Sequence, residues 1–103
     1  MSPQQKIVDV LRREIPYLKE NYGVKKIALF GSVVNGKYTK HSDIDMVVEF
    51  EKPIGLSFID MAEYLENKLG RKTDILTPDG LKSIRIKKVA QDIKRSLLYV
   101  QES

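Results

Sequence analysis

The chain has 103 residues, which suits one domain with one modest hydrophobic core, so we expect residues 1–103 to form a single domain. Apolar residues make up 42% of the sequence and charged residues 31%, a balance typical of soluble globular proteins. The sequence contains no cysteine, which excludes disulfides and thiolate metal sites. It also lacks a signal-peptide pattern and any apolar run near the ~20 residues that span a bilayer, so we expect a cytoplasmic protein.

The formal net charge is +4, and the positive charge is concentrated near the C-terminus. Between residues 82 and 95, one acid, Asp92, stands against six basic residues: Lys82, Arg85, Lys87, Lys88, Lys94 and Arg95. This segment predicts either a surface that attracts phosphates or an acidic partner, or an ordinary solvated helix face. Charge alone does not distinguish a protein partner from a nucleic acid.

The first predicted element is a helix that begins at Ser2-Pro3-Gln4-Gln5, with Ser2 as the N-cap and Gln5 bonding back to it. Apolar residues then follow helical spacing: Ile7, Leu11, Ile15, Leu18 and Tyr22. Pro16 is expected to kink or break this helix, and Gly23 to end it.

Four strands are predicted by apolar runs and by alternation. Residues 27–30 are short, fully apolar and closed by Gly31, as in a central strand. After a polar stretch with a turn at Gly36, residues 43–50 alternate between two faces, which is strand periodicity. Residues 73–76 form a third predicted strand that ends before Pro78, and residues 97–100 a terminal one.

Two further helices are predicted between and after these strands. The first covers residues 58–69, capped by Ser57 with Asp60 three residues on and stopped by Gly70, and the second covers residues 86–97. Tyr64 and Tyr99 are expected in the core. Interleaved helices and strands favour an α/β (α+β) domain with helices packed on a small sheet.

Asp43 and Asp45 are the most informative pair, because residues two apart on a strand point to the same side. Two carboxylates so placed can converge on one hard cation or bridge two cations. The alternative is a pair of acids on an exposed strand face. Asp74, inside the third predicted strand, could join them across the sheet, or be a surface acid of an edge strand. Three convergent carboxylates suit Mg²⁺.

Gly31 and Ser32 directly follow the first apolar strand. A glycine there lets the backbone approach a ligand closely, and a turn or helix that begins at Ser32 would direct N–H groups outward. The alternative is a glycine that ends a strand before a helix cap.

The order of these parts resembles the minimal nucleotidyltransferases of the DNA polymerase β-like superfamily. The resemblance rests on Gly31-Ser32, Ser42-Asp43-Ile44-Asp45 and residues 73–78, and it covers the chain from about Gly23 to Val100. It implies a small mixed sheet flanked by helices, a nucleotidyl transfer from ATP, and two Mg²⁺ ions. The implied metal-binding and catalytic residues are Asp43, Asp45 and Asp74, and the implied nucleotide-binding residues are Gly31, Ser32 and Ser42.

The resemblance also implies a partner, since such small proteins are often antitoxins paired with a HEPN-domain RNase toxin. The acceptor would then be a tyrosine hydroxyl of that toxin, modified with AMP. Two alternatives stay open: an idle module that neutralises its partner by contact, and a transferase for another acceptor such as a tRNA or a small antibiotic. One departure from the family pattern is the absence of an Arg shortly after Gly31-Ser32, where Lys37 is the nearest cation.

Overall fold

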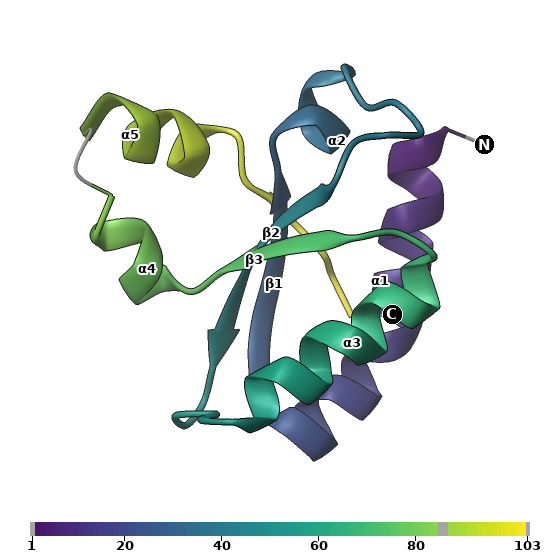
Figure 1. Ribbon diagram of the computed structural model, residues 1–103, viewed down its shortest axis with the longest axis vertical. Coiled ribbons are helices and arrows are strands. Elements are labelled where there is room, and N and C mark those ends of the chain that lie inside the picture. The colour runs from purple at the N-terminus through teal and green to yellow at the C-terminus, as the bar shows by residue number, and fades with distance from the viewer. Residues whose placement is uncertain (1, 85–86, 103) are drawn as a thin grey trace.

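The computed structural model describes residues 2–84 and 87–102 and contains one four-stranded sheet in the order β3-β2-β1-β4 (Figure 1). Strand β1 pairs antiparallel with β2 and β4, whereas β2 and β3 run parallel. The mixed α+β class predicted from the sequence is therefore confirmed. The elements are α1 Pro3–Tyr22, β1 Val24–Phe30, α2 Ser32–Asn35, β2 Ile44–Phe50, α3 Ser57–Leu69, β3 Thr73–Leu76, α4 Pro78–Lys82, α5 Lys87–Arg95 and β4 Leu98–Tyr99.

The core lies between one face of the sheet and the helices α1 and α3. Leu11 and Leu18 of α1 and Met61 and Leu65 of α3 are fully buried, and so are alternate residues of β2: Ile44, Met46 and Val48. Because successive strand residues point to opposite faces, the residues between these three face away from α1 and α3. Figure 1 shows α4 and α5 on the other side of the strands from α1 and α3. None of the helices in the described residues is long and apolar enough to cross a membrane.

The sequence predicts a kink or a break at Pro16; helix α1 continues through this residue, so it does not break there. Pro16 is exposed, whereas Ile15 and Leu18 on either side of it are buried in the core. A proline in a helix interior removes one backbone hydrogen bond and crowds the preceding turn. Burial of its neighbours offsets this local cost, because most helix stability in proteins comes from tertiary packing. The helix ends at Gly23, as predicted, with a left-handed φ of 68°.

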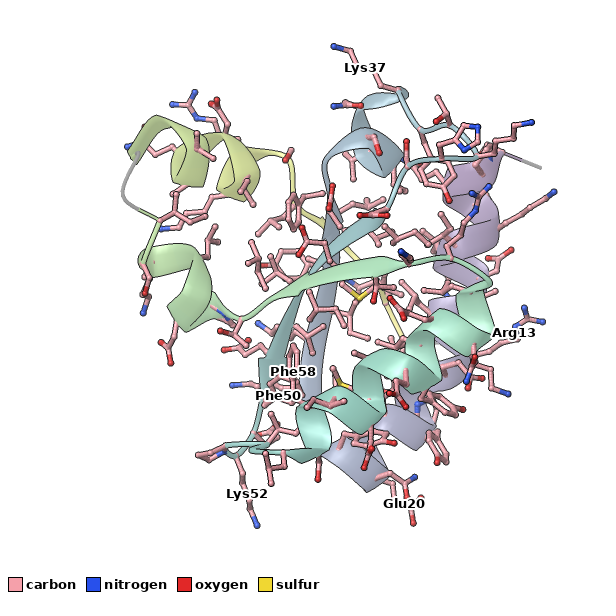
Figure 2. All side chains as sticks on the ribbon, viewed as in Figure 1. Arg13, Glu20, Lys37, Phe50, Lys52 and Phe58 are labelled. Atoms are coloured by element: carbon pink, nitrogen blue, oxygen red, sulfur yellow. The ribbon has the colours of Figure 1, made fainter. Side chains whose placement is uncertain are left out.

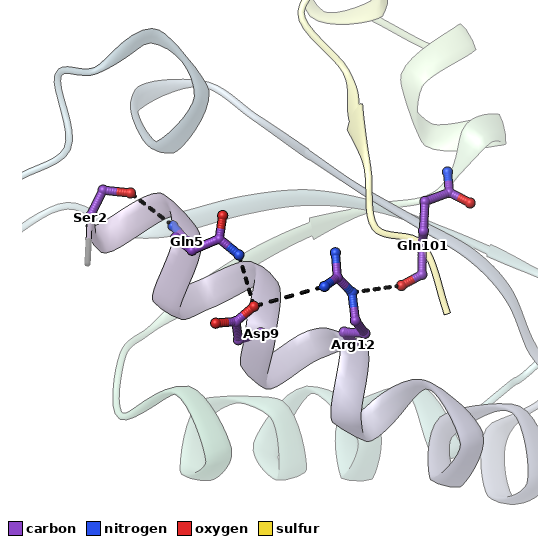
Figure 3. Close-up of polar contacts among 5 residues, drawn as sticks. All are labelled: Ser2, Gln5, Asp9, Arg12 and Gln101. Carbon is purple, nitrogen blue, oxygen red and sulfur yellow. Dashed lines mark hydrogen bonds and ion pairs between the residues drawn. The ribbon is translucent and has the colours of Figure 1, made fainter. Parts of the chain in front are cut away.

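The start of α1 confirms one predicted cap contact and corrects another (Figure 3). Ser2 Oγ accepts a hydrogen bond from Gln5 N at 3.1 Å. The Gln5 side chain does not reach back to the cap; its Nε2 donates to Asp9 Oδ1 at 2.8 Å, one turn further along. Arg12 Nε donates to the carbonyl of Gln101 at 3.1 Å, so α1 also holds the C-terminal segment.

One further predicted helix start is wrong, and one helix start was not predicted. Helix α3 begins at Ser57, but its N-cap is Leu56 in a helical conformation, and no side chain caps it. Ser57 is therefore inside the first turn, where its hydroxyl cannot act as the predicted cap. Helix α4 was not predicted, although Thr77 and Pro78 form a regular helix start, with Thr77 Oγ1 accepting from Gly80 N at 3.0 Å.

The last two elements of the chain are a helix and a strand, as predicted. Helix α5 covers most of the predicted final helix, of which Ile86 lies outside the described residues. Strand β4 lies within the predicted terminal strand and pairs with β1. Tyr99 is 50% exposed, so its predicted place in the core is wrong: it lies opposite Ala28 on the sheet face that α1 and α3 do not cover.

Tyr64 of α3 contacts Tyr17 and Glu14 of α1. Its ring stacks on Tyr17 at 4.5 Å between centroids, and its hydroxyl donates to Glu14 Oε1. This hydrogen bond, together with burial, raises the pKa of Tyr64 to about 12. Because the folded chain holds this proton more tightly than the unfolded chain, the stability contribution is full below pH 10.0 and is lost as the pH rises through about 12.

Tyr64→Phe is expected to lower the free energy of unfolding at neutral pH by about 1 kcal/mol, because it removes one hydrogen bond to a carboxylate. Urea denaturation of the purified protein measures this change. Tyr17→Phe is the matched control, since it keeps the stacked ring and removes a hydroxyl on an exposed residue. Equal effects of the two substitutions would contradict a role for the Tyr64–Glu14 hydrogen bond.

Candidate active site

Asp45 and Asp74 lie side by side on two neighbouring strands. Asp45 of β2 is the register partner of Asp74 of the parallel strand β3, so both side chains stand on the same face of the sheet. This is the face opposite the α1 and α3 core, because Ile44 and Met46 occupy that core. Asp43 directly precedes β2, two residues from Asp45. The structure therefore brings the three predicted acids to one end of the sheet.

The three carboxylates act on one another electrostatically. Partial burial, then the negative charge of Asp74 and then that of Asp43, raise the pKa of Asp45 above its ordinary value. Asp45 is half-buried, whereas Asp43 and Asp74 are exposed. Without a bound cation, the negative charge of Asp45 is unfavourable because two other acids lie close to it. A cation bound among the three carboxylates would relieve this repulsion.

The carboxylate oxygens of the three acids suit a hard cation that also binds ligands from outside the protein. Across residues 2–84 and 87–102, no three His, Cys, Asp or Glu side chains form a group that could hold a metal ion by themselves. The crowding of Asp45 by two other acids nevertheless shows that carboxylate charge is concentrated there. Mg²⁺ is commonly bound by one or two carboxylates, with water and substrate phosphates as its other ligands. The residues present fit that kind of site.

Gly31 lies directly against Asp45. It follows Phe30, the β1 register partner of Asp45, and its φ of 73° with ψ of −143° is a conformation that glycine alone adopts readily. A Cβ atom at this position would overlap Asp45 Oδ2 and lie 3.3 Å from its Cγ. The carbonyl of Gly31 accepts from the N–H groups of Val34 and Asn35, both at 3.0 Å, which starts α2 at Ser32. The missing side chain therefore makes room beside the carboxylates.

Ser42 closes the loop that leads into β2. Its Oγ accepts from Thr39 N at 3.0 Å, and its own N–H donates to the carbonyl of Thr39 at 3.0 Å. The N–H of His41 donates to Thr39 Oγ1 at 3.3 Å, and the His41 side chain is exposed. Ser42 Oγ also lies 3.3 Å from Thr39 Oγ1, so Ser42 fixes the shape of the loop that leads to Asp43.

Lys37 is the nearest cation after Gly31-Ser32 in the sequence. Figure 2 shows its side chain at the outer end of the α2 region, directed away from the sheet. Its N–H donates to the carbonyl of Ser32 and to Asn35 Oδ1, each at 3.1 Å, which holds its backbone in the turn after α2.

The basic C-terminal segment contributes exposed cations on α4 and α5. Lys82, Lys94 and Arg95 are exposed, and Arg85 lies outside the described residues. Because these helices lie on the uncovered side of the sheet, their positive charge is on the same side as the three acids (Figure 1). The structure leaves both predicted interpretations of this segment open.

A second group of cations was not recognised in the sequence. Lys6, Lys40 and Arg71 line a hollow of about 350 Å³, together with Tyr38. The Arg71 guanidinium lies 5.7 Å from the centroid of the Tyr38 ring. These residues come from α1, the loop before β2 and the turn after α3, so no spacing in the sequence connects them.

The sequence is similar to a nucleotidyltransferase family model and to proteins named as adenylyltransferases. A family model described as a nucleotidyltransferase domain matches residues 11–100. MJ1379 of Methanocaldococcus jannaschii, provisionally named a protein adenylyltransferase, is 41% identical over 103 residues, covering 97% of this chain and 100% of its own. Protein adenylyltransferase MntA of Thermococcus cleftensis is 37% identical over 101 residues, covering 97% of this chain and 98% of its own.

Solved structures confirm the expected nucleotidyltransferase core. A structure provisionally named a minimal nucleotidyltransferase has a TM-score of 0.70 at 23% identity and covers 95% of both chains. A toxin-antitoxin complex with AMP-PNP has a TM-score of 0.62 at 24% identity, covering 97% of this chain and 73% of that one. A complex of a tri-AMPylated Shewanella oneidensis HEPN toxin with an MNT antitoxin has a TM-score of 0.53 at 20% identity, covering 98% and 71%.

Proposed function

The chain belongs to the nucleotidyltransferase domain family, and from this premise we propose that it is an antitoxin that transfers AMP from ATP to a tyrosine hydroxyl of a HEPN-type RNase toxin. Relatives named as protein adenylyltransferases support AMP transfer to a protein, and the toxin-antitoxin complexes support a HEPN partner. The observation that carries the proposal is the pairing of Asp45 with Asp74 beside Gly31.

In this proposal, Asp43, Asp45 and Asp74 hold two Mg²⁺ ions, and Gly31, Ser32 and Ser42 bind the nucleotide. When bound, these ions would supply positive charge, which offsets the repulsion among the three acids. The same charge offsets the negative charge of the triphosphate, including the charge that develops during the in-line displacement. Carboxylate oxygens are the ligands that Mg²⁺ prefers, and no cysteine is present to favour a softer metal.

The chain's own groups orient the reactants and move one proton. Gly31 lets the Asp45 carboxylate lie against the backbone, and the Ser32 and Ser42 hydroxyls donate hydrogen bonds to phosphate oxygens. The tyrosine oxygen of the partner attacks the α-phosphorus, the bond from this phosphorus to the bridging oxygen breaks, and pyrophosphate leaves. Asp74 is exposed at the edge of the site and accepts the proton of the attacking hydroxyl.

Labelled ATP gives a direct test of the activity. The protein is incubated with ATP labelled at the α-phosphate, Mg²⁺ and the product of its neighbouring gene as the candidate HEPN partner, and label is measured on that partner. Asp43→Asn and Asp74→Asn are each expected to lower transfer by at least about a thousandfold, because each removes a charged ligand from the site.

Asp60→Asn is the matched control, since Asp60 is an exposed acid on α3, across the sheet from the site. It should transfer label as fast as the native protein. Undiminished transfer by the Asp43 and Asp74 variants would overturn the assigned roles. Neutralisation of the toxin without label transfer would instead favour an antitoxin that acts by contact alone, and label on a tRNA or a small molecule would identify another acceptor.

A further inference from the structure

No pattern in the sequence singles out Lys72, yet the structure sets it beside the three acids. Strand β3 pairs in parallel with β2, and Ile44 stands opposite Thr73. Ile44 N donates to the carbonyl of Lys72 at 2.9 Å, so the two segments still run side by side one residue before β3 begins. Continuing the register by that one residue places Lys72 opposite Asp43. A cation therefore stands at the end of the sheet where the carboxylates gather.

The Lys72 side chain belongs to the face of the sheet that carries the acids. Alternate residues of a strand share a face, so Lys72 shares the face of Asp74. Cα atoms of paired residues on neighbouring strands are about 5 Å apart, and those of alternate residues of one strand about 6.5 Å apart. The flexible lysine stem can therefore bring its ammonium over Asp43 or over Asp74. The preceding residue, Arg71, is directed elsewhere, since its guanidinium lies 5.7 Å from the centroid of the Tyr38 ring.

The Lys72 ammonium is available to a ligand. Lys72 is exposed, and among residues 2–84 and 87–102 it forms no ion pair within 4.0 Å, so neither Asp43 nor Asp74 holds it. A lysine ammonium has three hydrogen-bond donors and a full positive charge. It can therefore hold an oxygen atom on which negative charge develops.

The strand order places Lys72 on the side of the acids from which an acceptor enters. The order is β3-β2-β1, so Gly31 and Ser32, which follow β1, lie on one side of the β2 acids and Lys72 lies on the other. In the proposed function the triphosphate binds at Gly31 and Ser32. An in-line displacement requires the attacking oxygen to stand opposite the leaving pyrophosphate. The acceptor therefore approaches from β3, next to Asp74 and Lys72.

We propose that Lys72 binds the acceptor: its ammonium donates a hydrogen bond to the tyrosine oxygen of the partner and stabilises the negative charge that develops there. The inference rests on the proposed function. The tyrosine oxygen forms a bond to the α-phosphorus, the bond from this phosphorus to the bridging oxygen breaks, and pyrophosphate leaves with the electron pair. The hydroxyl proton passes to Asp74, and Lys72 keeps its own protons. An interaction that strengthens as charge develops raises kcat and contributes little to ATP binding.

Lys72→Met tests this role, because it keeps a long side chain and removes the charge. The protein is mixed with ATP labelled at the α-phosphate, Mg²⁺ and the product of its neighbouring gene as the candidate HEPN partner, and kcat and KM are measured. The kcat is expected to fall by about ten- to a hundredfold, as for the loss of one charged hydrogen bond in the transition state. The KM for ATP, and the affinity for ATP measured by calorimetry without the partner, should stay within about twofold. Lys72→Arg should restore most of the rate.

Arg71→Met is the matched control, since it removes the same charge from the adjacent residue, whose guanidinium lies at Tyr38. It should transfer label at the native rate. A native kcat in Lys72→Met would overturn the inference and leave the proposed function standing. Weakened ATP binding in Lys72→Met would also overturn it and assign Lys72 to the triphosphate, and equal slowing in both variants would assign the effect to the general charge of this surface. Absence of any transfer by the native protein would remove both the inference and the proposed function.

Discussion

Asp45→Asn is expected to abolish AMP transfer while making the folded chain more stable at neutral pH. The loss of activity should be at least about a thousandfold, because Asp45 lies between the other two acids and is proposed to contact both metal ions. The gain in stability follows from the raised pKa of Asp45, which has partial burial as its first cause and the charges of Asp74 and Asp43 as the others. Asn has a similar shape and carries no charge to be repelled.

The raised pKa of Asp45 also predicts how the stability of the native protein changes with pH. Because the folded chain binds the Asp45 proton more tightly than the unfolded chain, the contribution of Asp45 to stability is most favourable below its ordinary pKa of 3.8. That contribution is lost as the pH rises through the raised pKa of the folded state. Asn has no proton to lose, so the variant should exceed the native protein in stability at neutral pH, and the two should converge below pH 3.8.

Urea denaturation of both proteins between pH about 3.5 and about 7 measures this difference. Adding Mg²⁺ at neutral pH should stabilise the native protein more than Asp45→Asn, since an ion that binds only the folded state stabilises it in proportion to its affinity. Asp60→Asn, on the other side of the sheet, should show neither the pH effect nor the altered response to Mg²⁺. A variant less stable than the native protein at neutral pH would contradict the crowding of the three acids.

The sequence predicts the carboxylate face because strand geometry constrains it. Alternation in residues 43–50 predicts Asp43 and Asp45 on one side and Ile44 in the core. The structure buries Ile44 and sets Asp45 opposite Asp74 on the other face. The exact register of Asp45 opposite Asp74 does not follow from alternation, because it depends on where β3 begins after the turn at Gly70. That start is held by tertiary contacts: Thr73 N donates to Glu66 Oε2 at 2.9 Å, and Ile44 N to the carbonyl of Lys72.

Local rules failed where packing opposed them. Pro16 should interrupt a helix in isolation, but the buried side chains of Ile15 and Leu18 hold α1 together on both sides of it. The opposite error occurred at Tyr99, whose apolar ring was expected in the core. Tyr99 lies opposite Ala28 on the uncovered face because of the register in which β4 pairs with β1. The sequence does not specify this register. At both positions, the contacts of the folded chain outweighed the local preference of the residue type.

Gly31→Ala is expected to have the second largest effect, because it acts on both the backbone and Asp45. The φ of 73° with ψ of −143° is costly for any residue with a Cβ, by about 1–3 kcal/mol. The added Cβ also overlaps Asp45 Oδ2, so the carboxylate must rotate away from its place beside Asp74. A displacement of a reacting group by about 1 Å can cost about a hundredfold in rate. We therefore expect at least that loss of transfer, measured with labelled ATP.

Gly36→Ala separates the two causes, because Gly36 also has a positive φ, of 81°, while its Cβ would meet nothing within 4 Å. This variant should lose about 1 kcal/mol of stability to the left-handed backbone and keep its transfer rate within about twofold. Urea denaturation and the transfer assay on the same two proteins decide the matter. If both variants lost activity in proportion to their stability, backbone strain would explain Gly31. A selective loss of transfer in Gly31→Ala would mean that the transfer requires the space that this glycine leaves for the Asp45 carboxylate.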